Sequence, residues 1–109
     1  MLRTGSQRRK LCRACPIARV ADLVGDPCSL LIMRDVLEKP RKFSELEDSL
    51  GGMSPRTLTL KLKRLEHEGL IVREGYMRHP PRHFYAPTRK GIALRETIDA
   101  MRTYGKKYL

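Results

Sequence analysis

Apolar residues recur along this chain mainly at helical spacing, and at three places a residue that can cap a helix stands directly before proline. The pairs are Cys15-Pro16, Asp26-Pro27 and Ser54-Pro55. A capping side chain satisfies free backbone N–H groups of the first turn, and the fixed φ of proline suits the first helical position. Each pair therefore predicts a helix start, although cysteine is a poor cap.

The first two predicted helices differ in how apolar they are. The first begins at Pro16, carries apolar residues at helical spacing and ends at Gly25. The second begins at Pro27 and ends at Lys39-Pro40, because a residue before proline avoids the helical conformation. Its stretch from Leu30 to Leu37 is nearly all apolar, which predicts that the helix is largely buried.

A short third helix and a basic fourth helix follow. Ser44 and Glu47 have the spacing of a capping box, and Gly51-Gly52 predicts the end of a helix of about seven residues. The fourth helix is expected from Ser54 to about Glu68, before Gly69. A short helix, a glycine turn and a capped basic helix make a helix-turn-helix.

The rest of the chain predicts a hairpin and a last helix. Residues 70–73 and 83–86 have strand character, and the segment between them contains Gly75 and Pro80-Pro81. We expect a two-stranded hairpin with a long, basic tip. Thr88 is expected to cap a last helix in which Leu94, Ile98, Met101 and Tyr108 recur at heptad-like steps.

Together these elements predict an α+β, mainly α, winged helix-turn-helix: a three-helix core, a two-stranded wing hairpin, and N- and C-terminal helices for dimerisation. A chain of 109 residues is enough for one modest core. We expect a single domain over residues 12–109, preceded by a disordered basic arm over residues 1–11.

The charge distribution indicates a polyanionic partner. The formal net charge is +11 and the pI is near 10.1. Residues 1–19 have a net charge of +6, residues 20–53 of −3, and residues 54–90, with nine bases and three acids, of +6. Positive charge concentrated in two stretches favours contact with phosphates, with double-stranded DNA as the leading partner. The alternative is that the charge only keeps a small protein soluble.

A helical wheel of the fourth helix separates a core face from a basic face. Leu58, Leu62 and Leu65 fall within an arc of about 60° and are expected to face inward. An outer face that bears cations and hydroxyl groups suits the major groove, although it also fits an ordinary solvated helix. The predicted DNA-binding residues on this helix are Ser54, Arg56, Thr57, Thr59, Leu60, Lys61, Lys63 and Arg64.

The predicted wing strengthens this interpretation, because it adds Arg78 and Arg82 beside a rigid diproline that can lie along a groove. Surplus apolar residues on the terminal helices predict a homodimer. The expected interface consists of Ile17, Val20, Leu94, Ile98, Met101 and Tyr108. No apolar run approaches the length of a bilayer span or a signal peptide, so we expect a cytoplasmic protein that does not interact with membranes. With double-stranded DNA as its partner, we expect it to be nucleoid-associated.

Three cysteines do not make a disulfide framework. Cys15 stands at the expected start of the first helix, beside Arg13 and Arg19, in a setting where a thiol can be reactive. The alternative is a packed, inert thiol. Cys12 and Cys15 form one C-x-x-C pair, which is weak evidence for zinc without a second pair, and Cys28 is expected to be buried. No metal and no cofactor are predicted.

Taken in order, the motifs resemble those of the HxlR-type bacterial transcriptional regulators. The resemblance covers roughly residues 15–105, and its main motifs are Cys15-Pro16, Leu30-Leu31-Ile32-Met33-Arg34, Phe43-Ser44-Glu45-Leu46, Met53-Ser54-Pro55-Arg56-Thr57-Leu58-Thr59, Leu62-Lys63-Arg64-Leu65-Glu66, Gly69-Leu70-Ile71, Pro80-Pro81-Arg82 and Lys90-Gly91. The chain departs from the usual family residues at Pro27-Cys28, Leu60 and Phe84.

The resemblance implies a homodimeric winged helix-turn-helix regulator, repressor or activator, that binds a pseudo-palindromic operator. It also implies a sensor role for Cys15, because some members use a cysteine at this position to detect oxidants, quinones or aldehydes. Two other classes stay open: a winged helix that binds RNA or protein, and an enzyme with Cys15 as nucleophile. The first usually needs more aromatic residues, and the second lacks a histidine and a carboxylate beside the thiol.

Overall fold

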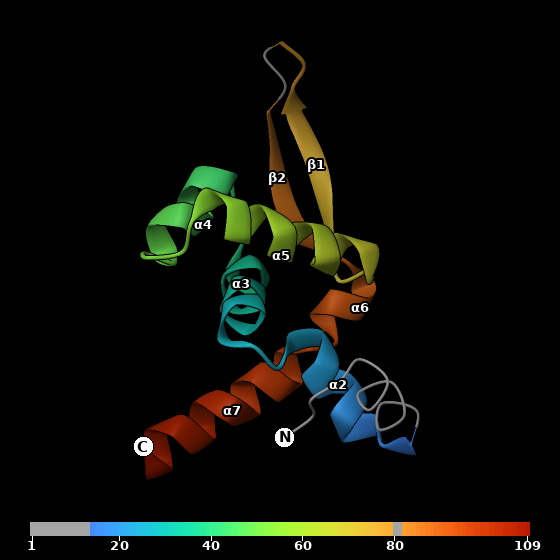
Figure 1. Cartoon of the computed structure of the whole chain (residues 1–109), viewed down its shortest axis with the longest axis vertical. Coiled ribbons are helices and arrows are strands. Elements are labelled where there is room, and N and C mark those ends of the chain that lie inside the picture. The colour runs from blue at the N-terminus through green and yellow to red at the C-terminus, as the bar shows by residue number, and fades with distance from the viewer. Residues whose placement is uncertain (1–13, 80–81) are drawn as a thin grey trace.

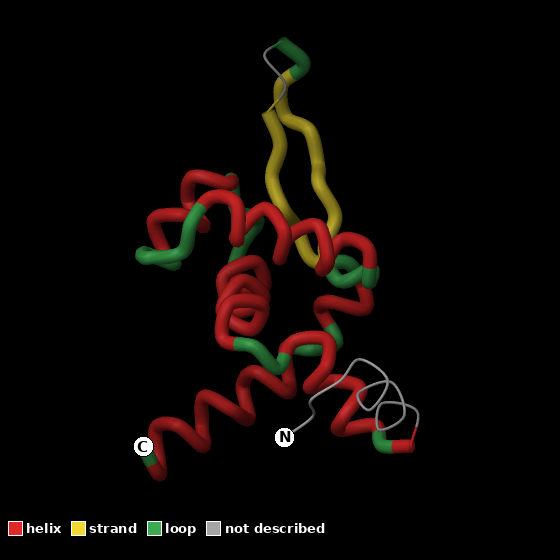
Figure 2. Tube along the Cα trace, in the orientation of Figure 1, coloured by secondary structure: helices red, strands yellow, loops and turns green. Residues whose placement is uncertain are grey.

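A computed structural model describes residues 14–79 and 82–109 of the chain. Its helices form a body from which one β-hairpin projects (Figures 1 and 2). The elements, in chain order, are α2 (Pro16–Val24), α3 (Pro27–Glu38), α4 (Phe43–Ser49), α5 (Pro55–His67), β1 (Ile71–Met77), β2 (Arg82–Pro87), α6 (Arg89–Ile92) and α7 (Arg95–Tyr108). This is the predicted mainly helical architecture with a two-stranded antiparallel wing.

Helix α3 is the centre of the body, as its apolar sequence predicts. It contacts α2, α5, α6 and the wing strand β2. The largest fully buried side chains come from α3, α4, α5 and the residue before β1: Ile32, Met33, Val36, Leu46, Leu58, Leu62, Leu65 and Leu70. In the described part of the chain, no helix is long and apolar enough to cross a bilayer.

Three predicted helix caps are confirmed, and one is wrong. The side chains of Asp26, Ser54 and Thr88 each accept a hydrogen bond from a backbone N–H three residues later. The exception is α4, which begins at Phe43 rather than after Ser44. The N–H of Lys42 therefore donates to Glu45 Oε1 at 2.9 Å, and this bond lowers the pKa of Glu45.

The predicted last helix is two helices, because the N–H of Leu94 bonds to the carbonyl oxygen of Gly91, only three residues back. A Cβ atom at Gly91 would lie 2.1 Å from the carbonyl oxygen of Leu70. Only glycine therefore allows α6 to approach the residue before β1 so closely. A turn at Ala93 and Leu94 then separates α6 from α7. Arg95, the first residue of α7, donates from Nη2 to the carbonyl oxygen of Leu37 at 3.0 Å.

The wing is longer than predicted and is anchored at its root. Its strands pair antiparallel from Ile71 opposite Pro87 to Met77 opposite Arg82, with an irregularity between Gly75 and Met77. The segment between α3 and α4 adds an isolated bridge, in which the N–H and C=O of Arg41 both bond to the backbone of Tyr85. Burial, aided by the nearby charge of Glu66, raises the pKa of the Tyr85 hydroxyl.

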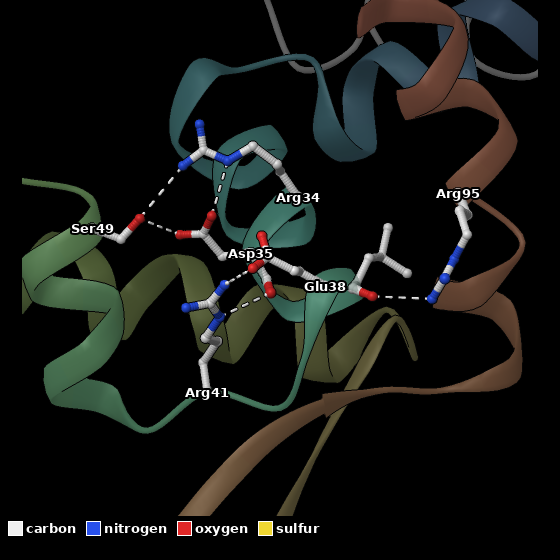
Figure 3. Close-up of polar contacts among 7 residues, drawn as sticks. Arg34, Asp35, Glu38, Arg41, Ser49 and Arg95 are labelled. Carbon is white, nitrogen blue, oxygen red and sulfur yellow. Dashed lines mark hydrogen bonds and ion pairs between the residues drawn. The ribbon is translucent and has the colours of Figure 1, made fainter.

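A buried carboxylate joins α3 to α4 (Figure 3). Asp35 is only 4% exposed; its Oδ2 accepts the hydroxyl hydrogen of Ser49 at 2.5 Å, and its Oδ1 lies 2.9 Å from Arg34 Nε. Nearby, Arg41 Nε donates to the carbonyl oxygen of Asp35 at 3.0 Å. These contacts fix the angle between the first helix of the helix-turn-helix and the core.

Candidate nucleic-acid interface

Helix α5 begins as the sequence predicts, and the hydroxyl group of Ser54 makes two hydrogen bonds at its start. Ser54 Oγ accepts the N–H of Thr57 at 3.1 Å and donates to Thr57 Oγ1 at 2.9 Å, and Pro55 occupies the first turn. Gly52 in the preceding turn has φ of 97°, the left-handed conformation expected of the glycine pair. The start of α5 is therefore set by local chemistry.

The two faces of α5 lie as the helical wheel predicts. Leu58, Leu62 and Leu65 are buried in the core. On the opposite side, one exposed row follows helical spacing, and we call it the reading stripe: Arg56, Leu60, Lys63 and His67. Leu60 is 59% exposed. Within residues 14–79 and 82–109, the side chains of Arg56 and Lys63 have no hydrogen bond or ion pair, so both are available to an external partner.

Both threonines of α5 make side-chain hydrogen bonds within the protein. Thr57 is half-buried and receives the hydroxyl hydrogen of Ser54. Thr59 donates its hydroxyl hydrogen to the carbonyl oxygen of Pro55 at 2.8 Å. Thr59 therefore offers an external group mainly an acceptor oxygen.

Two predicted DNA-binding cations, Lys61 and Arg64, do not join the reading stripe. Lys61 Nζ lies 3.0 Å from Asp26 Oδ2, and Arg64 Nη2 donates to the carbonyl oxygen of Asp22 at 2.7 Å. Burial raises the pKa of Asp26, but the hydrogen bonds from Ser29 and Lys61 and the charge of Lys61 outweigh it and lower the pKa overall. Sequence reasoning missed both acids, because they are distant in the chain.

The wing lies beside α5 and carries its own exposed cations. Arg73 on β1 pairs with Glu66 on α5, with Arg73 Nε 3.2 Å from Glu66 Oε2. A shallow groove between these elements is lined by Glu66, Val72, Arg73, Gly75, Arg78, Arg82 and His83. The predicted wing residues Arg78 and Arg82 are exposed, whereas Pro80 and Pro81 lie outside the described residues. The wing therefore meets α5 at the Arg73–Glu66 pair, beside a groove that Arg78 and Arg82 help to line.

A second exposed surface is apolar and lies on α2 and α7. Of the six predicted interface residues, Ile17, Val20, Met101 and Tyr108 are exposed. The other two point inward, because Ile98 is 8% exposed and belongs to the core, while Leu94 packs against it. Sequence reasoning missed Tyr104, which is exposed and whose ring centroid lies 5.0 Å from that of Tyr108; its helical spacing from Met101 and Tyr108 could have indicated it.

The two described cysteines are separate free thiols. Cys15 is half-exposed at the N-cap position of α2, where its side chain makes no capping hydrogen bond. Cys28 is half-buried rather than buried, and it lines a groove between the starts of α3 and α5. Cys12 and the basic arm predicted for residues 1–11 lie outside the described residues.

Comparison with known proteins identifies the family. The profile of the HxlR-like helix-turn-helix family matches residues 23–109. A curated HTH-type transcriptional regulator of Synechocystis is 38% identical over 95 residues, which cover 87% of this chain and 70% of that protein.

Solved structures of transcriptional regulators have a similar fold. A MarR-family transcriptional regulator from Porphyromonas gingivalis superposes with a TM-score of 0.80 at 28% identity, over 87% of this chain and 93% of that chain. The redox regulator HypR in its oxidised form also superposes with a TM-score of 0.80, at 26% identity, over 87% of this chain and 98% of that one. The relatives and the fold are those of transcriptional regulators and not of enzymes.

Proposed function

The chain belongs to the HxlR-like helix-turn-helix family of transcriptional regulators, and we propose that it is a dimeric protein that binds a specific DNA sequence. The observation that carries the proposal is an exposed face of α5 with two available cations, Arg56 and Lys63, beside a wing that exposes Arg78 and Arg82. Helix α5 enters the major groove, and Arg78 and Arg82 of the wing contact the backbone or the adjacent minor groove.

The reading stripe has the chemistry of base recognition. Arg56, near the start of α5, can donate two hydrogen bonds to guanine N7 and O6. Leu60 offers only apolar contact, which favours the methyl group of thymine. Thr59 provides an acceptor and Lys63 a further donor, while Ser54 and Thr57 hold the helix start that presents these residues.

The partner that completes the proposed operator complex is a second copy of the chain. The exposed apolar residues of α2 and α7 lie at the end of the body away from the wing tip (Figure 1), so an interface there leaves both reading helices free. Tyr104→Asp should shift the protein toward monomer in light scattering at micromolar concentration. Thr103→Asp, an exposed position of α7 outside the apolar row of Met101, Tyr104 and Tyr108, is the control and should leave the dimer intact. A parent protein that is monomeric would contradict the dimer.

We also propose that Cys15 makes DNA binding responsive to oxidants or electrophiles. The support is its half-exposed position at the start of α2 beside the proposed interface, together with the similarity to the redox regulator HypR. Treatment with diamide or a quinone should change DNA binding by the parent and by Cys28→Ser, but not by Cys15→Ser. A Cys15→Ser protein that responds like the parent removes the sensor role.

The proposed function is tested by selecting duplexes from a random pool with the purified protein. We expect an enriched site of two inverted half-sites about one helical turn apart. Single-stranded RNA should compete poorly for the selected duplex. Equal competition by RNA, or a pool without enrichment, would favour the alternative of a winged helix that does not read DNA sequence.

A further inference from the structure

Helix α5 carries four lysine and arginine side chains, and the structure divides them into two pairs. Arg56 and Lys63 belong to the reading stripe. Lys61 and Arg64 turn back toward the junction between α2 and α3, where each meets an aspartate. The same helix therefore presents two of its cations outward and holds the other two against the body.

The contact of Arg64 has two components at the end of α2. Nη2 donates to the carbonyl oxygen of Asp22 at 2.7 Å and lies 3.5 Å from its Oδ2. Carbonyl groups in the last turn of a helix lack partners within the helix and carry partial negative charge. Arg64 is thus attracted by a helix terminus as well as by a carboxylate, although its side chain is still 44% exposed.

The contact of Lys61 is made with an acid that is itself held in place. Asp26 is the N-cap of α3 and accepts bonds from Ser29 N at 3.2 Å and from Ser29 Oγ at 3.0 Å. The two bonds from Ser29 hold the Asp26 carboxylate in place. The ammonium group of Lys61, which lies 3.0 Å from Oδ2, therefore pairs with an ordered acid.

We propose that Asp22 and Asp26 are positioning residues that hold Arg64 and Lys61 away from DNA and thereby limit sequence-independent binding. The proposal rests on the DNA-binding function proposed above. Each cation that reaches a phosphate strengthens binding to every sequence alike, whereas discrimination depends on the ratio of specific to non-specific affinity. Two restrained cations beside a free reading stripe keep that ratio high.

The test measures how binding to a random-sequence duplex depends on salt. For B-DNA, the slope of log K against log salt steepens by about 0.9 for each phosphate newly neutralised. Asp26→Asn should steepen the slope by about this amount, because asparagine still caps α3 but has no charge to hold Lys61. Asp22→Asn should steepen the slope by less, because the carbonyl oxygen of residue 22 still accepts a hydrogen bond from Arg64. The double variant Asp26→Asn, Lys61→Ala should return to the parent slope, because the released cation is gone.

The matched control is Asp99→Asn on α7. Asp99 pairs with Arg102 at 2.6 Å, so this change also removes one acid and frees one arginine, but away from α5. It should leave the slope unchanged. Circular dichroism confirms that each variant is folded before binding is measured.

Three results overturn the inference. In the first, Asp26→Asn has the parent slope. In the second, its steeper slope persists without Lys61, so that the lost negative charge alone is the cause. In the third, Lys61→Ala or Arg64→Ala alone makes the parent slope shallower by about 0.9, which means that this cation already contacts a phosphate. A parent protein that binds no duplex overturns the proposed function and the inference with it, whereas an unchanged slope in a protein that binds DNA overturns the inference alone.

Discussion

Replacing Asp35 with alanine should destabilise the helix-turn-helix, because this buried carboxylate joins α3 to α4 (Figure 3). The change removes the acceptor of the Ser49 hydroxyl, at 2.5 Å, and the acid beside Arg34, at 2.9 Å. The backbone contacts of the neighbouring Arg41 stay in place. The loss is therefore confined to the link between the two helices.

The expected magnitude follows from the exposure of each partner. A hydrogen bond to a charged group contributes about 1.5–3 kcal/mol, and the Ser49 bond belongs to this class. The Arg34 pair contributes less than about 1 kcal/mol, because the arginine side chain is 40% exposed and water can replace the acid. Relief of the desolvation of Asp35 offsets part of the loss. We expect alanine to cost about 2 kcal/mol, and asparagine, which keeps an acceptor, about 1 kcal/mol.

Urea unfolding at fixed chain concentration, followed by circular dichroism, measures these values. Asp48→Ala, an exposed acid of α4, is the control and should change stability by less than about 0.5 kcal/mol. A double-mutant cycle of Asp35→Ala with Ser49→Ala should give a coupling energy of about 1 kcal/mol. The reasoning is refuted if Asp35→Ala costs no more than the control, or if the two changes are additive.

Other changes separate stability from recognition. Leu62→Ala, in the core, should lower the free energy of unfolding by about 2–5 kcal/mol in urea unfolding. Leu60→Ala should change it by less than about 0.5 kcal/mol but weaken a preference for thymine. Similar losses of stability in both variants would contradict the assignment of a buried and an exposed face to α5. Ser54→Ala should cost about 1 kcal/mol through loss of the cap, measured in the same assay, and no loss would mean that the cap is not stabilising. The pKa of Asp26 is lower in the fold than its ordinary 3.8, so its stabilisation is present above about pH 4 and is lost as the pH falls through the folded value. Asp26→Asn should therefore flatten the pH dependence of the urea midpoint below about pH 4, and an unchanged profile would contradict that account.

The elements that the sequence predicts well are those set by neighbouring residues. Asp26, Ser54 and Thr88 bond to N–H groups three residues away, so their type and spacing are sufficient to place the helix starts. The buried face of α5 is equally local, since three leucines at helical spacing determine which side turns inward. Base-reading candidates such as Arg56 follow directly from that face.

The features that the sequence does not indicate depend on contacts between distant parts of the chain. Gly91 packs against the carbonyl group of Leu70 at the start of the last helical segment, which helical periodicity alone does not indicate. Ile98 fits an exposed apolar row in sequence, but it is covered by the protein's own core. Arg64 meets Asp22 across 42 residues, and no local pattern relates these two positions.

The central claim is that the exposed row of α5 reads bases in the major groove. It is tested most directly by repeating the selection from a random duplex pool with the parent and with Arg56→Ala. We predict that both recover the same pair of half-sites and that the variant loses its preference at one base pair in each half-site, at a cost of about 1–3 kcal/mol for the preferred base. Full preference at every position with Arg56→Ala would contradict the claim.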